Sequence, residues 1–159
     1  MASTTTTAVK ATANRYIMVL PTVGVPYITI ALTGKKSLPQ LQGLVGGWIA
    51  TAPLKYYYVP DSFSNVYPKW ATVAKMLKKS PGREIYCNDE GGYDCPENMA
   101  LCMKDMGGIM HGLSPHLFGN VLIVLTQKKM DSYGIVPSEW AVGGLLASAL
   151  VISGAAVPA

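Results

Sequence analysis

The residues best suited to metal chemistry are the three cysteines and two histidines. They are Cys87, Cys95, Cys102, His111 and His116. Zn²⁺ prefers thiolate and imidazole ligands, yet no two cysteines have the C-x₂₋₄-C spacing that lets one turn chelate a metal. Cys87 and Cys102 fall in apolar segments, where cysteine behaves as a small core residue. We therefore predict reduced thiols, no metal site and no cofactor, since an odd cysteine count forms no complete disulfide framework.

Other groupings of reactive residues lack the context that their chemistry requires. The acidic stretch 88–92 offers oxygen ligands but not the alternating pattern of a twelve-residue calcium loop, so a hairpin connection is favoured. Ser114 and His116 are close in sequence, but no strand–nucleophile–helix elbow surrounds them. The glycines at 43–47 follow a helical pattern and not a strand, unlike a phosphate-binding loop. We expect no catalytic residue and a protein that is not an enzyme.

A basic and aromatic segment offers candidates for binding a partner. Pro68 is expected to open a helix that places Trp70, Val73, Ala74 and Leu77 on one face and lysines elsewhere. Three adjacent tyrosines at 56–58 cannot all face one core, so at least one should be exposed or lie at an interface. With the C-terminal apolar residues, the interaction candidates are Tyr56, Tyr57, Tyr58, Trp70, Lys75, Lys78, Lys79, Trp140, Leu145, Leu146 and Leu150.

The elements that must position these residues predict an α+β fold. Strands are expected at 16–20, 27–32, 48–51, 84–87 and 121–125, and helices at 37–45, 68–79 and 96–103. Ser37 and Gln40 form the S-x-x-Q pattern of a capping box, and Gly46–Gly47 should end that helix. Its apolar stripe is Leu38, Leu41, Leu44 and Val45. The prediction is a small mixed sheet of about five strands with two or three short helices on one face.

Composition divides the chain into a compact domain and two extensions. Residues 1–13 form a Thr-rich arm that is expected to be flexible. Residues 14–127 form the domain, with an aromatic and basic insertion at 54–82. A linker and an apolar segment of small residues follow at 128–159, where Ser138 is expected to cap a helix. The uncharged run 140–159 can dock on protein, enter a membrane or stay disordered.

A series of short motifs resembles the domain of unknown function 3846 family over roughly residues 16–127. The motifs are Leu38-x-x-Leu41-Gln42-x-x-Val45-Gly46-Gly47-x-Ile49, Asn88-Asp89-Glu90-Gly91, Pro96-x-Asn98-x-Ala100 and Gly119-Asn120-Val121. Such domains occur in phages, bacteria and large viruses, and no activity is established for them. The resemblance implies a viral or mobile-element origin. The insertion at 54–82 and both tails depart from the family pattern.

Low charge favours a protein that is held among others. Only 14% of the residues are charged, whereas globular chains average about a quarter. We expect a structural or interaction protein, a minor capsid-associated component of a virus particle whose partners are capsid subunits. Two alternatives are a small regulatory binder of nucleic acid or host defence proteins, and a tail-anchored viral membrane protein. Without a secretory signal pattern, the expected location is the virion, or otherwise the host cytoplasm or nucleus, and not the secreted space.

Overall fold

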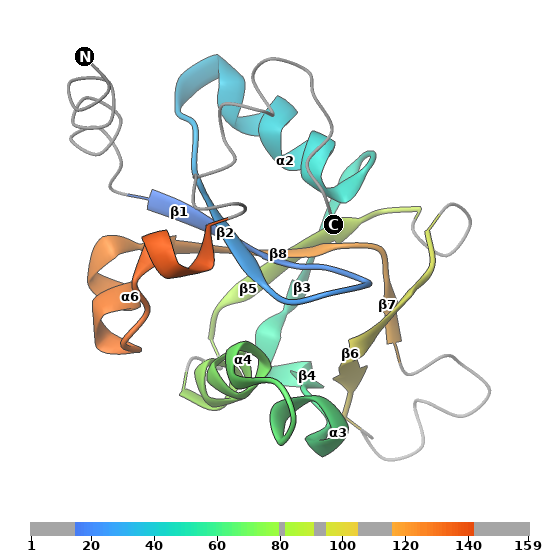
Figure 1. Ribbon diagram of the computed structural model, residues 1–159. Coiled ribbons are helices and arrows are strands. Elements are labelled where there is room, and N and C mark those ends of the chain that lie inside the picture. The colour runs from blue at the N-terminus through green and yellow to red at the C-terminus, as the bar shows by residue number, and fades with distance from the viewer. Residues whose placement is uncertain (1–14, 80–81, 91–94, 105–115, 142–159) are drawn as a thin grey trace.

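The computed structural model describes residues 15–79, 82–90, 95–104 and 116–141, which form two antiparallel sheets with short helices (Figure 1). The strands are β1 (Arg15–Leu20), β2 (Tyr27–Ile30), β3 (Ile49–Pro53), β4 (Tyr57–Tyr58), β5 (Glu84–Asn88), β6 (Glu97–Met103), β7 (His116–Phe118) and β8 (Val121–Thr126). The α-helices are α2 (Ser37–Val45), α3 (Asp61–Ser64), α4 (Pro68–Lys79) and α6 (Gln127–Ser132). The 3₁₀ helices are η1 (Gly34–Lys36), η2 (Leu54–Tyr56) and η3 (Pro137–Trp140).

The predicted α+β class is confirmed. One sheet has five strands in the order β2-β1-β8-β5-β3, and the other has the order β4-β6-β7. Two details differ from the prediction. The strand pairs are antiparallel, whereas a mixed sheet was expected, and helices cover both faces of the larger sheet instead of one. Figure 1 shows α2 on one face and α3 and α4 on the other.

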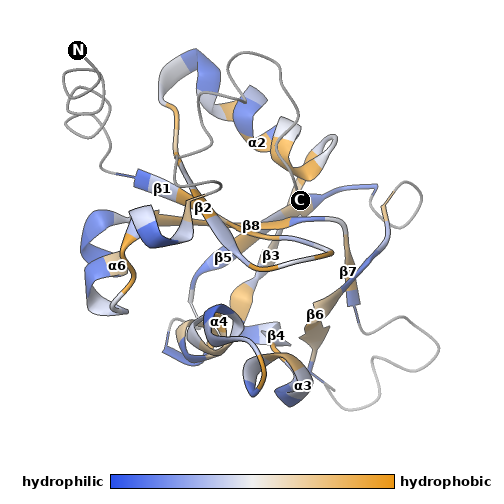
Figure 2. Ribbon diagram, viewed as in Figure 1, coloured by the Kyte–Doolittle hydropathy of each residue, from blue (hydrophilic) through white to orange (hydrophobic). Residues whose placement is uncertain are grey.

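Alternating side chains of the central strands feed two separate cores. In β8, Leu122 packs under α2, whereas Val121, Ile123 and Leu125 face the core that contains α4. Successive residues of a strand point to opposite faces, so an unbroken aliphatic run suits a strand that is covered on both sides. Figure 2 shows β8 largely orange and the outlying α6 largely blue.

The helix predicted at 37–45 is present as α2, but the predicted capping box is wrong. The N-cap residue is Lys36, and no side chain caps it. Gln40 is buried instead: its Nε2 donates to the carbonyl oxygen of Ile30 at 2.7 Å, and its Oε1 accepts from the Leu32 amide at 2.8 Å. Gln40 therefore bonds to the backbone at the end of β2 and not to the start of its own helix. Gly46 ends the helix with a left-handed φ of 82°, as predicted.

Residues 97–103, predicted as a helix, form the strand β6. Glutamate, methionine, alanine and leucine are good helix formers, but this segment pairs with β4 and β7. Its burial alternates at first, with Asn98 and Ala100 buried and Met99 exposed. The Asn98 side chain donates to the carbonyl oxygens of Leu20 and Gly119 at 2.9 and 3.1 Å. Tertiary contacts therefore override local propensity.

The segment after β8 is folded onto the larger core. Thr126 caps α6 by accepting from the Lys129 amide, and Met130, Ile135 and Trp140 are buried. The helix that follows is the 3₁₀ helix η3, whose N-cap is Val136, so the predicted cap at Ser138 is wrong because Ser138 lies inside it. Among the described residues, no helix is both long and apolar enough to cross a membrane.

Candidate functional site

The three tyrosines have three different environments. Tyr57 is buried in the larger core, and burial raises the pKa of its hydroxyl. Tyr56 is half-buried, with the Lys55 Nζ 5.4 Å from its ring centre. Tyr58 is 43% exposed. The prediction that at least one of them faces solvent is therefore confirmed.

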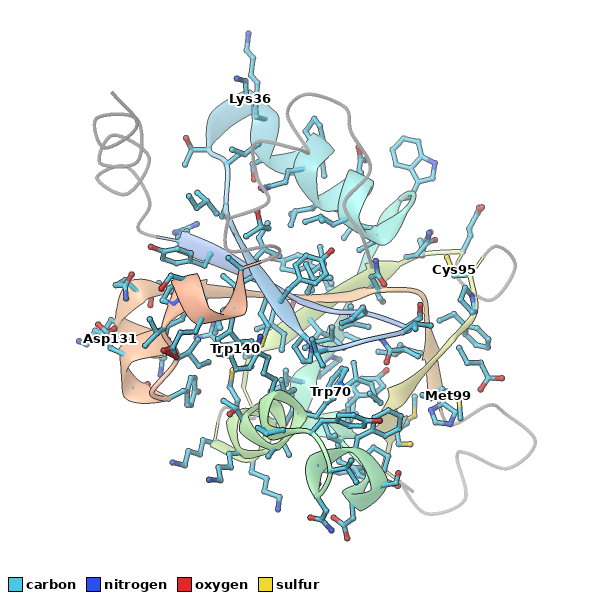
Figure 3. The ribbon with its side chains drawn as sticks, viewed as in Figure 1. Lys36, Trp70, Cys95, Met99, Asp131 and Trp140 are labelled. Carbon is cyan, nitrogen blue, oxygen red and sulfur yellow. The ribbon has the colours of Figure 1, made fainter. Side chains whose placement is uncertain are left out.

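Both tryptophan candidates belong to the core. Trp70 is 1% exposed, and its Nε1 donates to the carbonyl oxygen of Gly24 at 3.2 Å. Trp140 is also buried, with the Lys69 Nζ 5.5 Å from its ring centre. Figure 3 shows both indoles surrounded by other side chains, whereas Lys36 extends away from the protein. Neither indole is available to a partner in the folded chain.

The lysine candidates Lys75, Lys78 and Lys79 are exposed on α4, as expected for its solvent side. Within the described ranges they form no ion pair, so their charge is not neutralised locally. The candidates Leu145, Leu146 and Leu150 lie outside the described residues.

Four large apolar side chains that sequence reasoning missed are exposed on two neighbouring turns. Val23 and Val25, in the turn between β1 and β2, are 73% and 47% exposed. Val66 and Tyr67, between α3 and α4, are 64% and 45% exposed. We call these four residues the turn surface. The sequence does contain a signal for this surface. Apolar residues stand directly beside the turn residues Gly24 and Pro68, where a turn needs no apolar side chain.

The turn surface packs on aromatic residues that join its two turns. The Trp70–Gly24 hydrogen bond joins the β1–β2 turn to α4, and Tyr67 lies one helical turn before Trp70. Phe63 packs between them, with ring centres 6.2 Å from Tyr67 and 6.1 Å from Trp70. Because Trp70 is buried and Phe63 is half-buried beneath it, the turn surface needs little ordering before it meets a partner.

The structure brings together one pair of potentially reactive groups, Cys102 and His116. The Cys102 Sγ lies 3.6 Å from the His116 Nδ1, which is also 3.3 Å from the carbonyl oxygen of Leu101. Burial raises the pKa of the Cys102 thiol, and a hydrogen bond with Tyr58 opposes that shift. A raised pKa disfavours the nucleophilic thiolate, so this pair is poorly suited to covalent catalysis.

Among the described residues, the other metal-ligating and reactive candidates do not gather around this pair. Cys87 is buried, and burial raises its pKa. Cys95 Sγ accepts from the Asn88 side chain at 3.7 Å, and Asn88 also donates to the Val45 carbonyl oxygen. Over the residues that the structure describes, no three His, Cys, Asp or Glu side chains are placed to hold a metal ion. His111 and Ser114, and most of the acidic stretch after Glu90, lie outside them.

Comparison with known proteins adds no relative from which a role could be transferred. No family model, no curated protein and no solved structure matches the chain.

Proposed function

We propose that this protein is a non-enzymatic interaction protein that binds other protein subunits, further copies of its own chain among them, and that the turn surface is its main contact. The observation that carries the proposal is the exposure of Val23, Val25, Val66 and Tyr67 on a rigid aromatic support. Apolar and aromatic side chains that protrude from a well-packed base are typical of the centre of protein interfaces. Their burial against a partner is favourable by roughly 25 cal/mol per Å².

The specific form that we propose is a minor capsid-associated component of a virus particle. The low charge of the chain supports it, because subunits buried among others need fewer solvated groups. The resemblance to a family found in phages and large viruses supplies the viral setting. In this role the protein joins larger subunits and performs no chemistry, in keeping with the raised pKa of Cys102.

A regulatory binder of nucleic acid is the second candidate, and the lysines of α4, which form no ion pair with any described residue, favour it. Lys75, Lys78 and Lys79 lie on exposed positions within two helical turns. Three phosphate contacts would give a log–log salt dependence of affinity with a slope of about −2 to −3. A steep slope that disappears in the triple lysine-to-glutamine variant would favour this candidate over the capsid role.

Oxidative footprinting of the full chain at low and high protein concentration tests the main proposal. We expect Tyr67 to become protected as concentration rises, because association buries the turn surface, whereas Tyr58 should keep its reactivity. The two tyrosines are matched controls, since they are 45% and 43% exposed. Constant reactivity of Tyr67, or equal protection of both tyrosines, would contradict the assignment.

A further inference from the structure

The larger sheet opens into a fork between β5 and β8. All six residues of β8 pair with β1, but β8 pairs with β5 only at Tyr86 and Leu122. Beyond that pair, the Arg83 side chain donates from Nη1 to the Val124 carbonyl oxygen at 2.7 Å. A guanidinium group therefore replaces a backbone hydrogen bond between the separating strands.

The fork holds an open pocket of about 380 Å³. Its polar lining comes from Arg15, Arg83, Glu84, Tyr86 and Thr126, which belong to three neighbouring stretches of chain at one end of the sheet. This size lies within the range of small-molecule sites in proteins. The pocket is separate from the turn surface, because none of its lining residues belongs to either turn.

The course of α2 explains why this helix leaves one corner of the sheet uncovered. Near its start, Gln40 bonds to the end of β2. At its end, the carbonyl oxygens of Leu44 and Val45 accept from Asn120 and Asn88. The helix thus crosses the sheet diagonally and ends away from the corner where β5 begins and β8 finishes. Among the described residues, no α2 side chain lines the pocket.

The charges at the fork favour an anion. Arg15 and Arg83 face a single carboxylate, Glu84, and neither arginine forms an ion pair within the described part of the chain. A guanidinium has five N–H donors, and the described contacts of Arg83 use one of them. Planar guanidinium groups bind phosphate and carboxylate oxygens in pairs. Arg15 on β1 and Arg83 directly before β5 therefore offer more donors than a carboxylate has oxygens to accept.

We propose that this pocket binds a small phosphate monoester that carries hydroxyl groups. The three terminal oxygens of a phosphate can accept from both guanidinium groups at once. Glu84 repels a second anionic group, which disfavours a polyanion, but its carboxylate can accept a hydrogen bond from a ligand hydroxyl. The Tyr86 and Thr126 hydroxyls supply further polar contacts at the rim.

Isothermal titration calorimetry of the full chain at low salt tests the proposal with four probes: ribose 5-phosphate, ribose, inorganic phosphate and acetate. We expect ribose 5-phosphate to bind most tightly and inorganic phosphate more weakly. Acetate should bind weakest of the anions, and ribose should give no measurable heat. Acetate binding as tightly as inorganic phosphate, or no ribose 5-phosphate binding at millimolar concentration, would overturn the proposal.

Arg15→Gln identifies the site, because Arg15 is exposed and its loss leaves the Arg83–Val124 hydrogen bond intact. It should weaken ribose 5-phosphate binding at least about tenfold, the effect of losing a charge-assisted hydrogen bond. Lys79→Gln removes the same charge from α4 and should leave the affinity unchanged. Equal losses in the two variants would show non-specific attraction and contradict the site.

Glu84→Gln tests the two roles assigned to Glu84, which are to repel a second anionic group and to accept a hydrogen bond from a ligand hydroxyl. Removing the carboxylate should tighten binding of inorganic phosphate, because a repulsive charge is lost. The same change should reduce the advantage of ribose 5-phosphate over inorganic phosphate, because an amide is a weaker acceptor for the ligand hydroxyl. An unchanged preference between these two probes would contradict the role of Glu84.

Discussion

Single polar side chains decide how the elements of this protein meet, and Gln40 is the clearest case. Its amide bonds to one backbone carbonyl and accepts from one backbone amide at the end of β2, inside the protein. The pattern Ser37-x-x-Gln40 predicts a cap because it contains the right residues at the right spacing. The local pattern carries no information about β2, so the longer-range role of Gln40 could not be read from it.

Gln40→Ala should lower the free energy of unfolding by about 2–4 kcal/mol, because it leaves two backbone groups without partners in or near the core. Ser37→Ala should cost less than about 0.5 kcal/mol, since Ser37 makes no capping hydrogen bond. Urea denaturation of both variants measures the difference. A larger loss from Ser37→Ala than from Gln40→Ala would support the capping box instead.

Tyr27 gives the protein a dependence on alkaline pH. Burial raises the pKa of its hydroxyl from 10.0 to about 12. Between these values the unfolded chain loses a proton that the folded chain keeps, so stability is complete below pH 10 and falls as pH rises towards 12. Tyr27→Phe should flatten that fall when unfolding is measured by urea at successive pH values. An identical pH dependence in the variant would contradict this assignment.

At the scale of elements, the sequence predicts the parts whose burial is uniform and misses those that depend on distant pairing. The aliphatic runs of β1 and β8 are apparent because both faces of these strands are covered. β6 looks helical because its residue types are helix formers, and only its pairing with β4 and β7 makes it a strand. β4 has two residues and α3 has four, which is too short for a periodic signal.

Asn98→Ala tests how firmly β6 is joined to the rest of the protein. The change should cost about 2–4 kcal/mol, since the carbonyl oxygens of Leu20 and Gly119 both lose their donor. Met99→Ala is the matched control on the same strand, and it should cost little because Met99 is exposed. Thermal unfolding followed by circular dichroism compares them, and equal losses would contradict the strand assignment.

At the scale of the whole molecule, the sequence indicates binding to partners but not the surface that performs it. Aromatic residues are the natural candidates, yet Tyr57, Trp70 and Trp140 are buried. Trp70 instead supports exposed neighbours through its hydrogen bond to the Gly24 carbonyl oxygen. Exposure of Val23 and Tyr67 depends on how the β1–β2 turn sits beside α4, which no local pattern specifies.

Sedimentation velocity of the full chain over a range of concentrations tests the turn surface most directly. We compare the wild type with the double variant Val23→Ser and Tyr67→Ser. The control is Tyr58→Ser with Val136→Ser, which changes two side chains of comparable type that are 43% and 47% exposed. We predict concentration-dependent association in the wild type and the control, and a monomer in the turn-surface variant. A wild-type chain that stays monomeric at high concentration, or association that survives in the turn-surface variant, would contradict it.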